Sequence, residues 1–98
     1  MRTMLRFTFP VERGNEAVKD GTVEKTFAWL TEQLKPEAAY FMPDGGERGG
    51  LMVFDMTDSA QIPLIVETLC TRLDAAVELT PVMNADDLKR GLAKLKKA

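Results

Sequence analysis

The chain has 98 residues, of which 45% are hydrophobic and 29% are charged, a composition typical of one globular domain. Thirteen basic and fifteen acidic residues leave a net charge of −2, so the sequence predicts no nucleic-acid or membrane partner of the kind that a basic surface attracts. It contains no histidine, which excludes Ser-His-Asp and Cys-His nucleophile systems, and we expect neither a metal nor a cofactor. The single cysteine, Cys70, has no intramolecular disulfide partner, which favours a reducing cytoplasm.

The first third of the chain predicts a strand followed by a long helix. Residues 4–9 alternate between apolar and polar side chains until Pro10, as a half-buried strand does. A helix is expected from Asn15, as its N-cap, to the residues before Pro36. Gly21 weakens this helix and marks either a kink or a later start. Its apolar stripe consists of Val23, Phe27, Leu30 and Leu34.

The middle of the chain predicts a hairpin. Residues 38–43 and 51–56 resemble strands, and the glycine-rich residues 44–50 between them predict a flexible loop. This loop has no Gly-Lys-Ser/Thr ending and precedes no helix, so it is not a phosphate-binding loop. Pro43 places the first strand at a sheet edge, because proline donates no hydrogen bond to a neighbouring strand.

The last third predicts a helix, a strand and a final helix. Asp58 or Ser59 is expected to cap the first of these helices, and residues 76–81 alternate as a strand. Asn84 is expected to cap the final helix. The buried stripe of the earlier helix is expected to contain Ile62, Ile65, Val66, Leu69 and Leu73, and the final helix carries Leu88, Leu92 and Leu95.

The order β-α-β-β-α-β plus a helix predicts a single α+β domain over residues 1–98. Right-handed crossovers around a central hairpin favour a ferredoxin-like antiparallel sheet in the order 4-1-3-2, with both crossover helices on one face. The other face, called the open face below, would then carry polar and apolar side chains together. Such a face usually meets a partner, and we expect a second copy of the chain in a homodimer. Its expected members are Met4, Arg6, Thr8, Leu51, Val53, Asp55, Ala76, Glu78 and Thr80, with Tyr40 and Met42 if the hairpin pairs in the matching register.

The element order, the short opening strand and the ending Val77-Glu78-Leu79-Thr80-Pro81-Val82 before an acidic helix start resemble the dimeric α/β-barrel superfamily. More narrowly, the chain resembles small bacterial single-domain families of unknown function that are distantly similar to muconolactone isomerases and cofactor-independent monooxygenases. The resemblance implies that two sheets meet to form a barrel. It also implies that a small organic molecule binds between a sheet and its own helices.

The candidate site residues lie on the expected open face. Arg6 and Glu78 belong to strands that should be neighbours, so Arg6 would hold a carboxylate substrate while Glu78 acts as a base. Asp55 is the second candidate catalytic residue, and Tyr40 and Thr8 are candidate substrate-binding residues. The competing interpretation is that Arg6 and Glu78 form a structural ion pair at the dimer interface.

Three functions remain open from the sequence. The first is a cytoplasmic homodimeric domain that binds a small organic molecule. The alternative is a cofactor-independent isomerase or monooxygenase-like enzyme that acts on a small organic acid or aromatic compound. The third is an interaction module whose sheet receives a foreign protein, which predicts a monomer with an exposed sheet.

Overall fold

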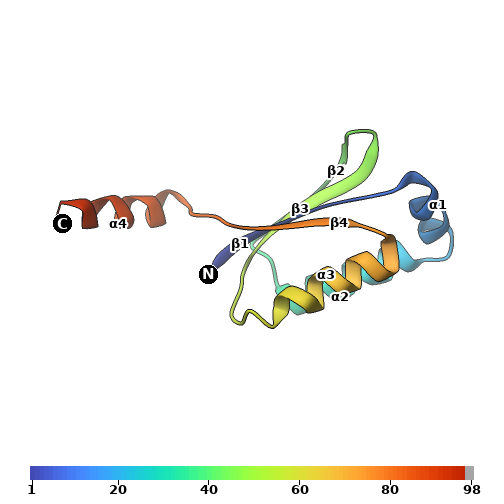
Figure 1. Ribbon diagram of the computed structural model, residues 1–98, viewed down its shortest axis with the longest axis horizontal. Coiled ribbons are helices and arrows are strands. Elements are labelled where there is room, and N and C mark those ends of the chain that lie inside the picture. The colour runs from blue at the N-terminus through green and yellow to red at the C-terminus, as the bar shows by residue number, and fades with distance from the viewer. Residues whose placement is uncertain (97–98) are drawn as a thin grey trace.

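The structure is a computed structural model that describes residues 1–96 and shows an α+β fold. Its four strands form one antiparallel sheet in the order β2-β3-β1-β4. Counted from the β4 edge, this is the order 4-1-3-2 (Figure 1). The elements are β1 (Arg2–Phe9), α1 (Val11–Lys19), α2 (Thr22–Leu34), β2 (Ala38–Asp44), β3 (Glu47–Asp55), α3 (Gln61–Leu73), β4 (Ala76–Pro81) and α4 (Ala85–Leu95).

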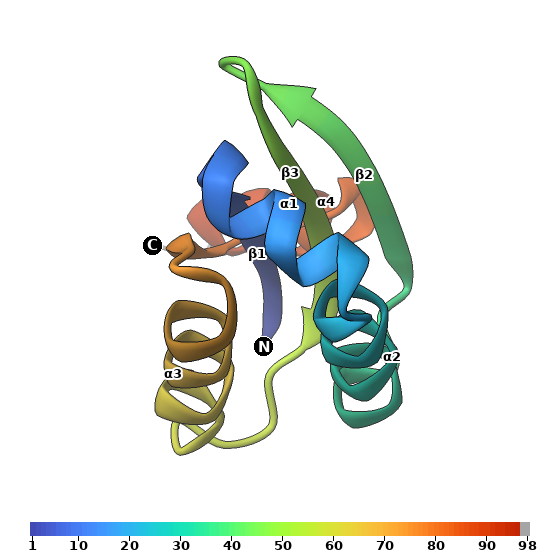
Figure 2. The ribbon, with the colours of Figure 1, turned by 90° about the vertical axis from the view of Figure 1, so that its right-hand side faces the viewer.

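The core lies between one face of the sheet and the helices α2 and α3, which lie side by side beneath it (Figure 2). Alternate side chains of β1 and β3 enter this core, because successive residues of a strand point to opposite faces. The assignment of Met4, Arg6, Thr8, Leu51, Val53 and Asp55 to the opposite, open face is therefore confirmed for these two strands. The buried apolar side chains are Leu5, Phe7, Phe9, Met52 and Phe54 from the sheet, Ala17, Phe27, Leu30, Leu34, Ile65, Leu69 and Leu73 from the helices, and Ala75 from the connection before β4.

The expected single helix from Asn15 to residue 34 is wrong, because the chain forms two helices here. Helix α1 begins at Val11 with Pro10 as its N-cap residue, so Asn15 lies inside it and caps nothing. Helix α2 begins after Gly21, whose φ of 84° is left-handed and interrupts the helical path. The later start that Gly21 suggested is therefore correct.

The flexible loop expected over residues 44–50 is also wrong. Strand β2 continues to Asp44 and β3 begins at Glu47, so only Gly45 and Gly46 remain as a two-residue turn. Both glycines have positive φ, 60° and 85°, as a tight hairpin turn of this hand requires. The edge position predicted from Pro43 is confirmed, because β2 is an outer strand.

The remaining boundaries follow the sequence closely, with two corrections. The N-cap residue of α3 is Ala60, and the side chain of Asp58 instead accepts a hydrogen bond of 2.9 Å from the Ala60 N–H. Ile62 is exposed rather than part of the buried stripe. Strand β4 has the expected bounds, and Asn84 caps α4 in a capping box with Asp87.

Helix α4 gives the molecule an elongated shape, because it projects beyond the end of the sheet (Figure 1). The molecule measures 56 × 27 × 18 Å, and its radius of gyration is 15.7 Å, against about 13 Å for a compact domain of this length. No residue of α4 is buried. Among residues 1–96, no helix has the length and apolar character needed to cross a membrane.

Candidate functional site

The strand register places the expected residues on the open face. Arg6 lies directly opposite Glu78 on β4 and Leu51 on β3. Tyr40 on β2 is also opposite Leu51, so the hairpin register that brings Tyr40 and Met42 to this face is correct. Residues directly opposite one another in a sheet point to the same side. The open face is therefore one continuous surface across all four strands.

Arg6 and Glu78 are neighbours on this face but form no ion pair with each other within residues 1–96. Arg6 instead pairs with Asp44 at the end of β2, at 3.1 Å between Nη2 and Oδ2. A hollow of about 60 Å³ lies between these groups and Thr8. Because a water molecule occupies about 30 Å³ of liquid, this hollow is too small for an organic acid. Within one chain, Arg6 and Glu78 do not enclose a substrate.

The other two candidate residues lie apart from this hollow. Asp55 is exposed at the far end of β3, where its carboxylate pairs with the amino group of Met1 at 2.8 Å. Tyr40 is exposed on the outer strand. The structure therefore brings Arg6, Thr8 and Glu78 together, and it separates Asp55 and Tyr40 from them along and across the sheet.

A much larger groove lies on the helix side of the sheet. It has a volume of about 770 Å³ and runs between α1, α2 and the β2–β3 hairpin. Ligand sites for small organic molecules have volumes of roughly 300–1,000 Å³. The apolar residues that line it are Phe9, Val11, Val18, Val23, Phe27, Phe41, Met42 and Pro43, together with Glu24, Gly46, Glu47, Arg48 and Gly49.

Aromatic rings form one wall of this groove. Phe27 stacks on the buried ring of Phe7 with a centroid distance of 4.8 Å, and it meets Phe41 edge to face at 5.2 Å. Phe41 nevertheless remains 59% exposed, and Val11 and Val18 are also exposed across the groove. The groove therefore offers an exposed apolar and aromatic surface to a planar molecule.

Arg48 places a cation at the groove. Its guanidinium donates to neutral acceptors of α1, at 3.1 Å to Asn15 Oδ1 and 3.4 Å to the Val11 carbonyl. Within residues 1–96 it forms no ion pair, although Glu24 and Glu47 also line the groove. The α1 backbone approaches closely here, because a Cβ on Gly14 would come within 2.5 Å of Arg48 Nη1. The guanidinium of Arg48 is therefore held in position by neutral acceptors.

The sequence reasoning missed Arg48 and Phe41, although a signal for both was present. The alternation that places Met52 and Phe54 in the core also places residues 50 and 48 on that face, provided that β3 begins before residue 51. Phe41 likewise alternates with Tyr40 and so faces the helices. The assignment of residues 44–50 to a flexible loop hid this continuation.

A scan against protein-family models finds no match, and a search of curated proteins finds none either.

Proposed function

We propose that this protein binds a small, largely apolar organic anion in the groove between α1, α2 and the β2–β3 hairpin. The groove itself is the observation that carries the proposal. It has a volume of about 770 Å³, its lining is mainly apolar, and one cation, Arg48, is positioned at it. Burial of apolar ligand area there would supply most of the affinity. The anion would be held by Arg48, whose planar guanidinium suits a carboxylate.

Two matched ligands test both halves of this proposal. 1-Naphthoate carries an aromatic body and a carboxylate, whereas 1-naphthalenemethanol has the same body without the charge. Isothermal titration should show saturable binding of 1-naphthoate with the higher affinity. Arg48→Gln should weaken 1-naphthoate binding about 10- to 100-fold and leave the alcohol nearly unchanged, because a hydrogen bond to a charged group contributes roughly 1.5–3 kcal/mol and each 1.4 kcal/mol is about tenfold in affinity.

The adjacent aromatic residues of β2 provide a matched control. Phe41→Ala should weaken both ligands, because Phe41 lines the groove. Tyr40→Ala removes a ring from the opposite face of the same strand and should leave groove binding intact. If neither ligand binds saturably at millimolar concentration, the proposal is wrong. Equal losses with Tyr40→Ala and Phe41→Ala would move the site away from the groove.

We also propose that the binding protein is a ferredoxin-like homodimer of the dimeric α/β-barrel type, paired through its open face, and that it resides in the cytoplasm. Half-buried apolar side chains support the pairing, because Met4, Leu51 and Val53 lie between polar residues on a face that no helix covers. The free thiol of Cys70 supports a reducing compartment.

The alternative proposal is a cofactor-independent isomerase or monooxygenase-like enzyme that uses the open face. Its support is the hollow shared by Arg6, Thr8 and Glu78, which a second sheet could close into a larger site. Glu78 would act as the base, with Arg6 and Thr8 holding the substrate. Asp55 and Tyr40, the other residues expected to orient the substrate, lie apart from this hollow and would reach it only from the sheet of a second copy. Glu78→Gln should then abolish turnover of an organic acid without affecting groove binding of 1-naphthoate. Unchanged turnover would remove Glu78 from the mechanism.

A further inference from the structure

Helix α4 carries an uncovered apolar stripe. Leu88, Leu92 and Leu95 recur on one side of the helix and are 45%, 53% and 69% exposed. A helix of 11 residues is marginal in water unless an apolar face is packed against another surface. Within residues 1–96 the fold supplies no such surface, because α4 projects beyond the sheet and none of its residues is buried (Figure 1).

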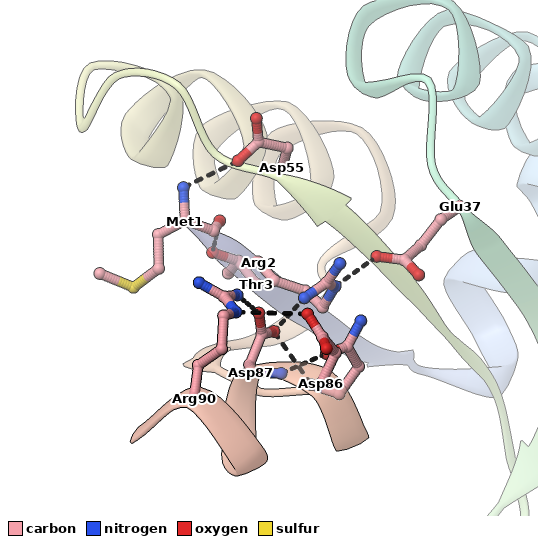
Figure 3. A network of polar contacts seen from close by, with 9 residues as sticks. Met1, Arg2, Thr3, Glu37, Asp55, Asp86, Asp87 and Arg90 are labelled. Atoms are coloured by element: carbon pink, nitrogen blue, oxygen red, sulfur yellow. Dashed lines mark hydrogen bonds and ion pairs between the residues drawn. The ribbon is translucent and has the colours of Figure 1, made fainter. Parts of the chain in front are cut away.

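The start of α4 is nevertheless held firmly against the sheet. Arg2 pairs with Asp87 in the first turn of α4 and with Glu37, at 2.7 Å, before β2 (Figure 3). Asp87 also accepts a hydrogen bond of 3.1 Å from the Asn84 N–H and forms a second ion pair with Arg90. These contacts set the direction in which α4 leaves the body of the molecule.

The same network locates α4 relative to the open face. Arg2 lies opposite Asp55 and alternates with Met4 and Arg6, so its side chain belongs to the open face. Because Arg2 holds Asp87, the first turn of α4 meets the sheet from that side. The leucine stripe, defined as Leu88, Leu92 and Leu95, therefore begins where the open face ends.

The chain has enough uncovered surface for a dimer interface. A compact 10.9 kDa monomer exposes about 5,600 Å², whereas this chain exposes 6552 Å². Each partner of a stable complex buries ~800 Å², so an interface of ordinary size would return the chain to about the exposure of a compact monomer. Charge also favours a second copy, because Lys89 and Lys96 lie along one side of the stripe and Glu78 on the open face forms no ion pair within residues 1–96.

We infer that α4 is a dimerisation arm whose leucine stripe packs on a second copy of this chain. In a two-fold dimer each copy gives its arm to the other and receives one in return. The inference rests on the homodimer of the proposed function and specifies a part of its interface outside the sheet. It does not depend on groove binding, because α4 does not line the groove.

Analytical ultracentrifugation of the full chain and two variants tests the arm. The double variant Leu88→Lys/Leu92→Lys should raise the dimer dissociation constant at least tenfold. Ala93→Lys adds one lysine, half the added charge of the double variant, about 140° round the helix from Leu88 and should change the dissociation constant less than twofold. The leucines are exposed in the single chain, so circular dichroism should show an intact fold in both variants.

Each outcome decides a different claim. A dimeric wild type that keeps its dissociation constant in the double variant overturns the arm but leaves the open-face dimer standing. A wild type that stays monomeric at 100 µM overturns both, whereas 1-naphthoate binding to that monomer would leave the groove proposal intact. Leucine-dependent co-sedimentation of a monomer with phosphatidylserine vesicles would reassign the stripe to a membrane surface and overturn the arm.

Discussion

Gly50 gives the sharpest test of how the groove wall is built. A Cβ placed on Gly50 would lie 2.5 Å from the carbonyl oxygen of Tyr40 and 2.8 Å from Cζ of Phe7. Phe7 is almost fully buried and stacks on Phe27, so its ring has little room to move. The absent side chain of Gly50 therefore lets the aromatic cluster pack directly on the backbone of β3.

Gly50→Ala should consequently lower the free energy of unfolding. Overpacking of a core costs about 1–3 kcal/mol. Loss of glycine's freedom in the unfolded chain offsets about 0.4–1 kcal/mol of this. The net loss should be about 1–2 kcal/mol, which corresponds to a fall in Tm of roughly 5–15 °C for a domain of this size. The affinity for 1-naphthoate should also fall, because Phe27 and Phe41 would shift with Phe7.

Urea unfolding followed by circular dichroism, at one fixed protein concentration, measures the loss. Gly91→Ala is the matched control, because a Cβ at Gly91 in α4 meets nothing within 4 Å. This control should be neutral or stabilising, since alanine favours an exposed helix. The reasoning is refuted if Gly50→Ala unfolds at the same urea concentration as the wild type, or at a higher one.

Two further substitutions probe the core and the base of the arm. Thr26→Val should raise the free energy of unfolding, measured with urea, by about 1 kcal/mol, because Thr26 Oγ1 is buried without a hydrogen-bond partner in the described chain. A lower free energy of unfolding in the variant would show that the hydroxyl has a partner. The hydrogen bond from the Asn84 N–H, assisted by the charge of Arg2, holds the pKa of Asp87 below its ordinary value of 3.8. A depressed carboxyl pKa stabilises the folded state above that ordinary value and ceases to do so as the pH falls through the folded-state pKa. The amide hydrogens of α4 should therefore exchange faster below about pH 4, beyond the intrinsic change of exchange rate with pH. Asp87→Asn should remove most of this acid dependence. Equal acid dependence in the wild type and the variant would exclude Asp87 as its cause.

Local patterns in the sequence predicted most of the fold. Alternation with a period of two residues placed Leu5, Phe7 and Phe9 on one face of β1, which is buried. The preference of asparagine for the N-cap position predicted that α4 starts after Asn84. The prediction failed at the glycines. Glycine is compatible with a loop, a turn and a strand, so residues 44–50 alone did not distinguish a mobile connection from a two-residue turn between longer strands.

The candidate site required more than local pattern. Alternation correctly brought Arg6 and Glu78 side by side, but it could not show that Asp44 is the partner of Arg6. Ion pairing depends on where the end of another strand lies, and that position follows from the register of the whole sheet.

By itself, the sequence determined the order of the four strands, the helices α2, α3 and α4 between and after them, and the face that β1 and β3 bury, because these depend on periodicity within a few residues. Only the tertiary structure decided where α1 lies, that Arg48 enters a groove beside Phe41, and that α4 projects with its leucines uncovered. These features depend on how distant segments pack, on Gly14 lying close to Arg48 and on Arg2 holding Asp87. No repeat along the chain encodes such contacts, because they are made between residues that are neighbours only in the folded state.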